Sequence, residues 1–252
     1  MTAQIAALFR HPIKGFTPEK VKSAQLSRGQ AFPCDRLYAL EDGPCGFDPA
    51  APTFIPKQRF AVLAKIAEVA RAHTRLDAAS GRFHATAEGM APFSGDLAQP
   101  ADQAAFAAWA AQLLGDAAQG PLRLLDGGEH RFLDHPLGHV SIISLASVRD
   151  LERRLGRPLD PLRFRANLYI DGWPPWAENH WTGRTLRLGE AEATVFKPIV
   201  RCAATMVDPV TAERDIDVPA ALFDFYGHTL CGIYVQVTKG GTVKEGDEAQ
   251  AG

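Results

Sequence analysis

Cysteine is scarce in this chain of 252 residues, and the spacing of the few that occur excludes several kinds of metal site. The four cysteines, Cys34, Cys45, Cys202 and Cys231, lie far apart and form no CxxC pair. This spacing argues against a zinc ribbon. A plant-type iron–sulfur centre needs several closely spaced thiolates, which no segment supplies. We therefore expect no iron–sulfur cluster in this chain.

Long apolar runs and an excess of charge of one sign are also missing. No stretch of about 18 apolar residues occurs, as a membrane-spanning helix would need. Residues 1–10 lack the basic region, apolar core and cleavage site of a secretory signal. We therefore expect no membrane association and a cytoplasmic location. Lys and Arg number 27 against 29 Asp and Glu, a net charge of -2, which gives no reason to expect a nucleic-acid partner.

Short apolar segments bounded by glycine, proline or polar residues recur along the chain, as is typical of β-strands. Hydrophobic residues make up 46% of the chain and charged residues 22%, which is ordinary for a soluble globular protein. The pattern predicts a β-rich α+β fold, in which a barrel or closed sheet carries peripheral helices. The expected strands cover residues 4–9, 21–26, 35–40, 69–76, 82–87, 122–125, 140–143, 164–170, 185–188, 193–200 and 231–238.

Two helices are predicted from apolar residues at helical spacing between start and stop signals. The first is alanine-rich, begins with Asp102 as its cap and ends at Gly115. The second is capped by Ser144 or Ser147 and ends at Gly156. Both are expected to pack against the sheet.

The remaining segments give weaker signals. A third helix is predicted over residues 219–227. Residues 60–66 could begin another helix, although the segments after them look like a hairpin. A weak break at residues 115–121 is the nearest thing to a domain boundary. We expect residues 247–252 to be frayed.

The segment at residues 196–209 is the best place to look for chemistry. Cys202 follows a buried strand at the point where it gives way to a loop, and a turn around Asp208 follows. The cation of Arg201 next to it would favour the thiolate, which is the form that binds metals or attacks electrophiles. Free cysteine is also among the most buried residue types, so a structural Cys202 remains open at this stage.

Several basic residues stand next to strand ends, where apolar neighbours would desolvate them. Burying such charges costs several kcal/mol each unless an anion or carboxylate pairs with them. A shared bound anion is one explanation. Separate pairing with carboxylates, or extension of each side chain into water, is the other. The cations are Lys14, Arg36, Arg163, Arg165 and Arg201, and the candidate carboxylates are Asp35, Asp160, Asp171 and Asp208.

Residues 163–209 resemble the MOSC domain family, whose signature joins an RFRPN strand to a later RCxxTxVDP segment. Residues 231–247 resemble the closing GxY strand and GxVxxGD turn of that family. The positions that match the signature are Arg165, Asn167, Glu178, Trp181, Gly189, Arg201, Cys202, Thr205, Val207, Asp208 and Pro209.

The front of the chain carries a second, less specific resemblance. Residues 11–14 and 34–36 resemble the YPIKS and GDR motifs of the β-barrel-like region that precedes MOSC in the mitochondrial amidoxime-reducing component and its bacterial relatives. The two resemblances cover nearly the whole chain. They imply a MOSC β-barrel with peripheral helices at residues 119–248, after an N-terminal β-rich domain at residues 1–118. The chain departs from the family pattern at Gly15, Cys34, Ala166 and residues 211–213.

The resemblance also implies a cofactor and the residues that would hold it. In that family the conserved cysteine binds molybdenum in the molybdenum cofactor, so Cys202 is expected to be the metal ligand and a catalytic residue. Asp208 is the second catalytic candidate, because it could orient a proton donor, although capping the turn is the other role open to it. Pyridoxal phosphate is not expected. The residues expected to bind the cofactor are Lys14, Arg36, His139, Ser144, Arg165, Asn167, Arg201 and Tyr234, of which His139, Ser144 and Tyr234 match more loosely.

The activity implied by the resemblance is the two-electron reduction of a small molecule, such as an N-hydroxylated base or an N- or S-oxide. No iron–sulfur domain follows Gly252, so electrons are expected from a separate protein of the ferredoxin or flavoprotein type. Two alternatives stay open. The chain could carry the cofactor, or sulfur on Cys202, to another protein without acting as an enzyme, or it could have kept the fold without a cofactor.

Overall fold

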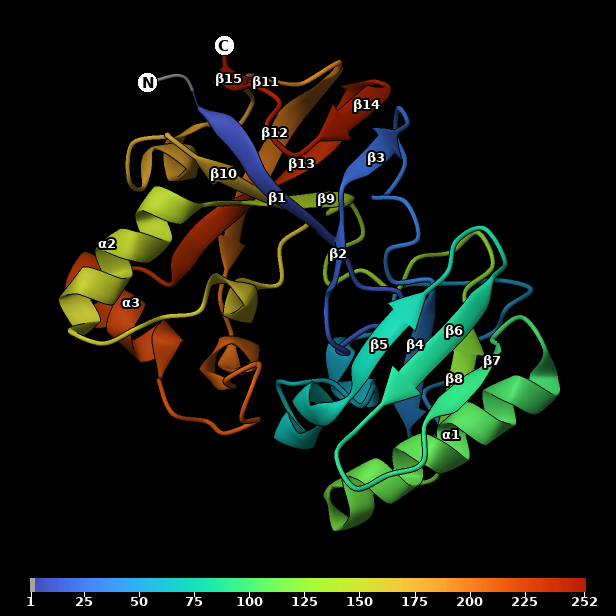
Figure 1. Ribbon diagram of the computed structural model, residues 1–252. Helices are drawn as coiled ribbons and strands as arrows, with labels where there is room; N and C mark the ends of the chain where they lie inside the picture. Colours follow the sequence, from blue (N-terminus) through green and yellow to red (C-terminus); the bar gives the residue numbers. More distant parts are fainter. Residues whose placement is uncertain (1–2) are drawn as a thin grey trace.

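Eight strands form one curled sheet, which is the largest part of the computed structural model (Figure 1). The structure describes residues 3–252. The strand order is β15-β11-β12-β13-β9-β10-β1-β2. In that order the strands span Ala249–Ala251, Thr185–Leu188, Ala191–Val200, Leu230–Lys239, Val140–Ser144, Leu168–Asp171, Gln4–Arg10 and Glu19–Val21. The predicted β-rich α+β fold is confirmed.

One parallel pair sits inside this otherwise antiparallel sheet. Strands β9 and β10 run parallel, and α2 (Leu145–Leu155) lies between them in the chain, since a parallel pair needs a crossover connection. The other pairs are antiparallel. β12 and β13 form the longest pair, and their register shifts at three places. Such irregularities bend a strand, which helps the sheet to curl.

The N-terminal half adds smaller sheets at the lower right of Figure 1. There β4 (Tyr38–Asp42) pairs with β8 (Leu122–Asp126). Elsewhere, near the top of Figure 1, β3 (Ser23–Leu26) pairs with β14 (Gly241–Lys244) from the end of the chain. A three-stranded sheet joins β5 (His73–Leu76), β6 (Arg82–Thr86) and β7 (Phe93–Asp96). The predicted hairpin is therefore confirmed as β5 and β6. The predicted division of the chain at residue 118 stays a prediction.

Helix α1 (Pro100–Leu114) packs against β7 and β8 of the two sheets at the lower right and contributes the centre of their core. It buries Phe106, Trp109 and Leu113, as the apolar spacing predicts. The predicted cap is wrong: Gln99 is the N-cap, and Asp102 lies inside the first turn. The Asp102 side chain instead accepts a hydrogen bond from the Asp96 N–H at 2.7 Å and ties the helix to β7. Gly115 ends the helix as predicted.

Helices α2 and α3 (Val218–Tyr226) pack together at the left of Figure 1. The Ser144 hydroxyl caps α2 by accepting a hydrogen bond from the Ser147 N–H, as one of the two predicted alternatives requires. Gly156 and Gly227 end the two helices with positive φ angles of 67° and 72°, which glycine adopts without strain. No helix in the described part of the chain is long and apolar enough to cross a membrane.

Two strands begin later than predicted, and the backbone conformation of an arginine explains both differences. β4 begins at Tyr38 and β10 at Leu168, later than predicted, because Arg36 and Arg165 have φ angles of 51° and 53°. A left-handed residue cannot continue a strand.

Two other predictions are also corrected, and the structure contains strands that the sequence did not predict. Residues 60–66 form no helix, and a 3-10 turn, η2 (Ala67–Arg71), follows them. The tail at residues 247–252 is not frayed, because β15 pairs with β11. β7 and β14 are strands that the sequence did not predict.

We expect Phe106→Ala to lower the free energy of unfolding by about 3 to 5 kcal/mol, because it opens a cavity that its neighbours cannot fill. The Phe106 ring is 0% exposed and lies within 6 Å, centroid to centroid, of the rings of Phe16, Phe83, Phe93 and Trp109. Urea denaturation measures the change. The control is Phe54→Ala, at a side chain that is 45% exposed, for which we expect a loss below about 1 kcal/mol. Equal losses in the two variants would contradict this account of the core.

Candidate functional site

A cavity of about 220 Å³ opens where the end of β12 meets loops of the N-terminal half. Seven short segments that lie far apart in the sequence line it. They contribute Lys14, Gly15, Arg36, Lys57, Val62, Leu63, Ala64, Asp134, His135, Ser141, Arg163, Phe164, Arg165, Lys197, Ile199, Val200, Arg201, Cys202, Ala204, Thr205 and Tyr234. The cavity therefore exists only because the two halves of the chain pack against each other.

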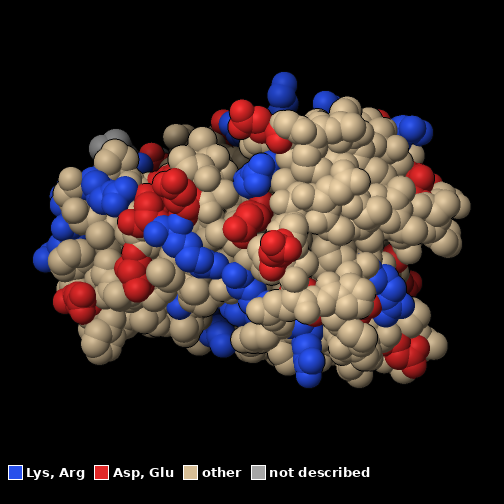
Figure 2. Space-filling view, turned by 90° about the horizontal axis from the view of Figure 1, so that it is seen from below, with Lys and Arg blue, Asp and Glu red and all other residues tan. Residues whose placement is uncertain are grey.

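The lining is strongly cationic although the whole chain carries a net charge of -2. Asp134 is the carboxylate in the lining, and the cations in the lining are Lys14, Arg36, Lys57, Arg163, Arg165, Lys197 and Arg201. In the space-filling view, basic side chains form a band across the face seen from below, with acidic side chains beside it (Figure 2). A cleft lined by one sign of charge attracts ligands of the other sign, so this site favours an anion.

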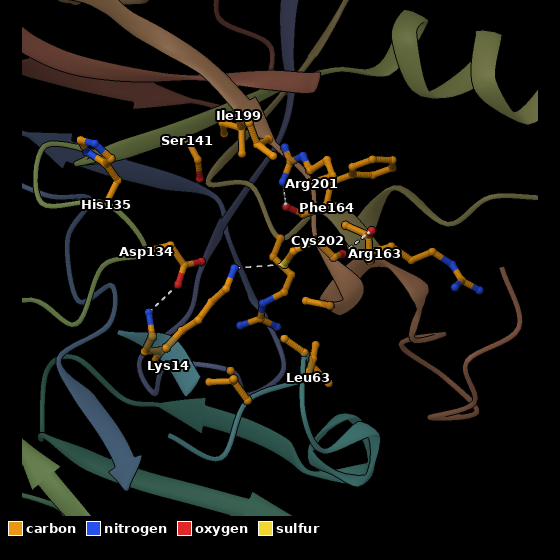
Figure 3. A pocket seen from close by; sticks show the side chains of 18 of the residues that line it. Lys14, Leu63, Asp134, His135, Ser141, Arg163, Phe164, Ile199, Arg201 and Cys202 are labelled. Atoms are coloured by element: carbon orange, nitrogen blue, oxygen red, sulfur yellow. Dashed lines mark hydrogen bonds and ion pairs between the residues drawn. The ribbon is translucent and has the colours of Figure 1, made fainter. Parts of the chain in front are cut away.

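Cys202 lies near the centre of the pocket wall, directly after β12 (Figure 3). Its side chain is half-buried and its sulfur accepts a hydrogen bond from Lys57 Nζ at 3.1 Å. The turn η6 (Ala203–Met206) follows, with Cys202 as its N-cap. The Cys202 carbonyl accepts hydrogen bonds from the backbone N–H and the hydroxyl of Thr205 within this turn. The thiol is thus presented to the pocket by a fixed backbone, next to an ammonium group.

Lys14 and Asp134 form an ion pair on the opposite wall (Figure 3). Lys14 Nζ donates to Asp134 Oδ1 at 2.5 Å and to the Phe132 carbonyl at 2.9 Å. Burial lowers the pKa of Lys14, and the charge of Asp134 opposes that effect only in part. Burial would raise the pKa of Asp134, but the charges of Lys14, Arg36 and Lys57 outweigh it and hold that pKa well below its usual range.

Arg36 is held by the carboxylate that precedes it. Asp35 is fully buried, pairs with the Arg36 guanidinium, and accepts a hydrogen bond from the backbone N–H of His11 at 2.6 Å. Burial opposes ionisation of Asp35, yet the Arg36 charge and the His11 hydrogen bonds keep the pKa of Asp35 well below its usual range. Burial lowers the pKa of His11 to about 3, so this ring is neutral near physiological pH. The cluster fixes Arg36 at the pocket wall.

Arg165 is a partly buried cation of the lining that has no carboxylate partner in the part of the chain that the structure describes. No carboxylate forms an ion pair with it within residues 3–252, although it lies in the lining. Burial, and then the charge of Arg36, lower the pKa of Arg165 to about 10. Its φ of 53° lies in the left-handed region, which residues other than glycine seldom adopt. An anion bound in the pocket would relieve the cost of burying it.

Arg163 and Arg201 are bound to other groups of the protein. Arg163 pairs with Asp208 at 2.7 Å and donates to the Met206 carbonyl at 3.0 Å. Arg201 Nε and Nη1 donate to the carbonyls of Cys231 and Phe164 at 2.7 and 2.8 Å. The sequence left open whether the cations share an anion or pair separately. Arg36 and Arg163 pair with carboxylates, whereas Arg165 does not.

Six predicted site residues meet in the lining and four do not. The six are Lys14, Arg36, Arg165, Arg201, Cys202 and Tyr234, and the four are His139, Ser144, Asn167 and Asp208. Ser144 caps α2. The Asn167 amide accepts hydrogen bonds from Ser141 and donates one to the Phe9 carbonyl, which ties β1, β9 and β10 together. His139 Nδ1 is buried and has no hydrogen-bond partner within residues 3–252.

Asp208 is occupied by the turn that follows it. Its Oδ1 accepts hydrogen bonds from the backbone N–H groups of Val210 and Thr211, at 2.8 and 2.9 Å, while its Oδ2 binds Arg163. Asp208 therefore caps the turn, which is one of the two roles that the sequence left open for it, the other being the orientation of a proton donor.

Lys57, Asp134 and Lys197 line the pocket, but the sequence did not single them out as site residues. Asp134 stands in a polar loop between two predicted strands, which gives a weak signal for a site. Lys57 follows a loop rich in glycine and proline and has no neighbouring motif. Only the fold brings it to Cys202, which lies 145 residues further along the chain.

Family models match both halves of the chain. The MOSC domain matches residues 129–250, and the MOSC N-terminal beta barrel domain matches residues 2–122. Among solved structures, the YUAD protein from Bacillus subtilis aligns over 100% of this chain and 96% of its own, with 13% identity and a TM-score of 0.45. YiiM from Geobacillus stearothermophilus aligns over 45% of this chain and 54% of its own, with 20% identity and a TM-score of 0.37.

Curated relatives are distant and longer than this chain. Molybdenum cofactor sulfurase from Caenorhabditis elegans is 31% identical over 122 residues, which is 46% of this chain and 16% of that protein. Mitochondrial amidoxime reducing component 2 from Bos taurus is 31% identical over 120 residues, which is 43% of this chain and 35% of that protein. The matches thus span about a third or less of these relatives. Since the two family models together account for nearly all of its residues, the chain belongs to the MOSC family, as a MOSC domain preceded by a MOSC N-terminal beta barrel domain.

Proposed function

We propose that this chain is a reductase that holds the molybdenum cofactor in the pocket at Cys202. Its substrates would be small N-hydroxylated compounds or N- and S-oxides, in keeping with its similarity to mitochondrial amidoxime reducing components. The observation that carries the proposal is a thiol presented to a cationic pocket in which Arg165 lacks a carboxylate partner. A ligand that carries a soft metal and also a negatively charged group would bind to the thiol and to the arginine at the same time.

The side chains present fit such a group. A thiolate suits a metal that already carries sulfur ligands, and Cys202 is the thiol in the lining. Guanidinium groups bind phosphate through two parallel hydrogen bonds, which suits Arg36 and Arg165. Lys14 adds a point charge to the same pocket. When bound, the molybdenum would supply the two-electron chemistry, while the protein binds and orients.

The residues around Cys202 have separate tasks in this proposal. Lys57 Nζ holds a proton against the sulfur and balances the charge of a thiolate. Asp134 holds Lys14 in place and offsets part of the positive charge. Val62, Leu63 and Ile199 supply apolar walls that exclude water and so strengthen the electrostatic contacts inside the pocket.

A second candidate function is a carrier that delivers the cofactor, or sulfur bound to Cys202, to another protein. The observation that favours it is the similarity to molybdenum cofactor sulfurases over nearly half of this chain. The reductase differs from the carrier in its need for electrons, which we propose come from a separate ferredoxin or flavoprotein. A cytoplasmic location remains a prediction.

Cys202→Ser should abolish molybdenum binding, because a hydroxyl is a poor ligand for a soft metal. The measurement is metal analysis of the purified protein. Cys45→Ser is the matched control, since Cys45 lies in the N-terminal half outside the pocket lining. We expect the control to keep its molybdenum. Full metal content in Cys202→Ser would mean that the ligand is assigned to the wrong residue.

Arg165→Gln should lower retention of the pterin about tenfold or more, because a charge-assisted hydrogen bond contributes roughly 1.5 to 3 kcal/mol. Glutamine removes the charge while keeping a side chain at the left-handed backbone position. Fluorescence of the released and oxidised pterin measures occupancy. Arg187→Gln is the control, at an exposed arginine on β11 that pairs with Glu248. Equal occupancy in the two variants would show that Arg165 does not hold the cofactor.

The loaded protein should reduce an N-hydroxylated base when it receives electrons from a strong chemical reductant. The assay follows product formation with wild-type protein and with Cys202→Ser, for which we expect no turnover. A panel of N-hydroxyl, N-oxide and sulfoxide compounds covers the substrate class. Absence of turnover on the whole panel, together with transfer of cofactor or sulfur to an empty acceptor enzyme, would favour the carrier.

A further inference from the structure

A buried acid lies behind the strand end that presents Cys202. Glu178 belongs to the turn η5 (Ala177–His180) and is 0% exposed. Its Oε1 accepts a hydrogen bond from the Ser147 hydroxyl at 2.7 Å, and that hydroxyl accepts one from the Trp176 N–H at 2.8 Å. Since Ser147 is in α2, one carboxyl oxygen is anchored to a helix.

The second carboxyl oxygen of Glu178 has a matching unpaired donor nearby. Glu178 Oε2 and Arg201 Nη2 are both buried, and neither has a hydrogen-bond partner within residues 3–252. Both lie beside Gly232: a Cβ atom there would be 3.0 Å from Nη2, and the Gly232 N–H interacts with the Glu178 carboxyl. Buried polar atoms normally have partners. One buried water between them would satisfy both.

We infer that Glu178 is a positioning residue for Cys202, holding the Arg201 guanidinium from behind through a shared buried water. Arg201 Nε and Nη1 already bind the carbonyls of Cys231 and Phe164, and the Phe164 contact is visible in Figure 3. The third nitrogen, Nη2, completes this hold only through Glu178. Cys202 is the next residue in the chain. When all three nitrogens of the Arg201 guanidinium are held, the backbone at Cys202 is held too, and with it the position of the thiol in the pocket.

The protonation of Glu178 makes the hold depend on pH. Burial raises the pKa of Glu178 to about 7, although the Ser147 hydrogen bond and the Arg201 charge oppose this effect. The charged and titratable groups that face Glu178 are Arg201 at the end of β12 and Cys231 on β13. Burial raises the pKa of Cys231 to about 12, so Cys231 stays protonated across the range in which Glu178 titrates. Below about pH 7 the acid is neutral, and above it the carboxylate attracts Arg201 more strongly.

The test measures how fast iodoacetamide alkylates Cys202 in cofactor-free protein, with peptide mass mapping to separate Cys202 from the other cysteines. Wild type, Glu178→Gln and Glu178→Ala are compared from about pH 5.5 to 8.5, on either side of the Glu178 transition. We expect the ratio of the wild-type rate to the Glu178→Gln rate to change about threefold or more across pH 7. Glu178→Ala should differ from Glu178→Gln at every pH, because alanine leaves Arg201 Nη2 without a partner.

Glu41→Gln is the matched control, at another buried carboxyl that is 4% exposed and pairs with Arg123 in the N-terminal half. Its rate relative to wild type should stay constant with pH. A flat ratio for Glu178→Gln would overturn the inference, and so would a lower Tm of Glu178→Ala with unchanged Cys202 rates. The inference rests on Cys202 as the functional thiol of the proposed reductase. The assay needs neither cofactor nor turnover, so its result is independent of the activity assay.

Discussion

The dominant constraint on this structure is the positive charge gathered around a single thiol. Arg36, Arg165 and Lys14 lie in one small pocket, where burial makes each charge costly. Asp35 and Asp134 outweigh that cost at Arg36, whereas burial still lowers the pKa of Lys14 and of Arg165. A protein keeps such an arrangement only where the rest of the fold stabilises it. Arg36 and Arg165 both have a left-handed backbone, a costly conformation that persists where the surrounding structure holds it.

The fold meets this constraint by building the pocket from both halves of the chain. The N-terminal half supplies Lys14, Arg36 and Lys57, and the eight-stranded sheet supplies the thiol at the end of β12. β1 belongs to the same sheet as β12, so the loop that carries Lys14 leaves directly from the scaffold that carries Cys202. Hydrogen bonds from Arg214 to the carbonyls of Ala203 and Leu63 join the two sides again below the pocket.

The sequence predicted the features that depend on local signals. Helix ends at Gly115, Gly156 and Gly227, and the position of Cys202 after a strand, follow from neighbouring residues alone. It could not predict the Lys57 contact with Cys202, which spans 145 residues and has no motif. It also placed the starts of two strands too early, because nothing in the composition shows that an arginine adopts a positive φ.

Arg201 lies where the sequence predicted, but its side chain has a different role from the predicted one. The sequence placed its cation beside the thiol, and the structure confirms the neighbourhood, yet its donors bind the carbonyls of Cys231 and Phe164. The side chain clamps strand ends together, while the ammonium group at the sulfur comes from Lys57 in the other half of the chain. A ligand that contacts both Cys202 and Lys57 therefore binds only the state in which both halves are docked. By mass action, such a ligand stabilises that docked state by an amount that grows with the logarithm of the ratio of its concentration to its dissociation constant.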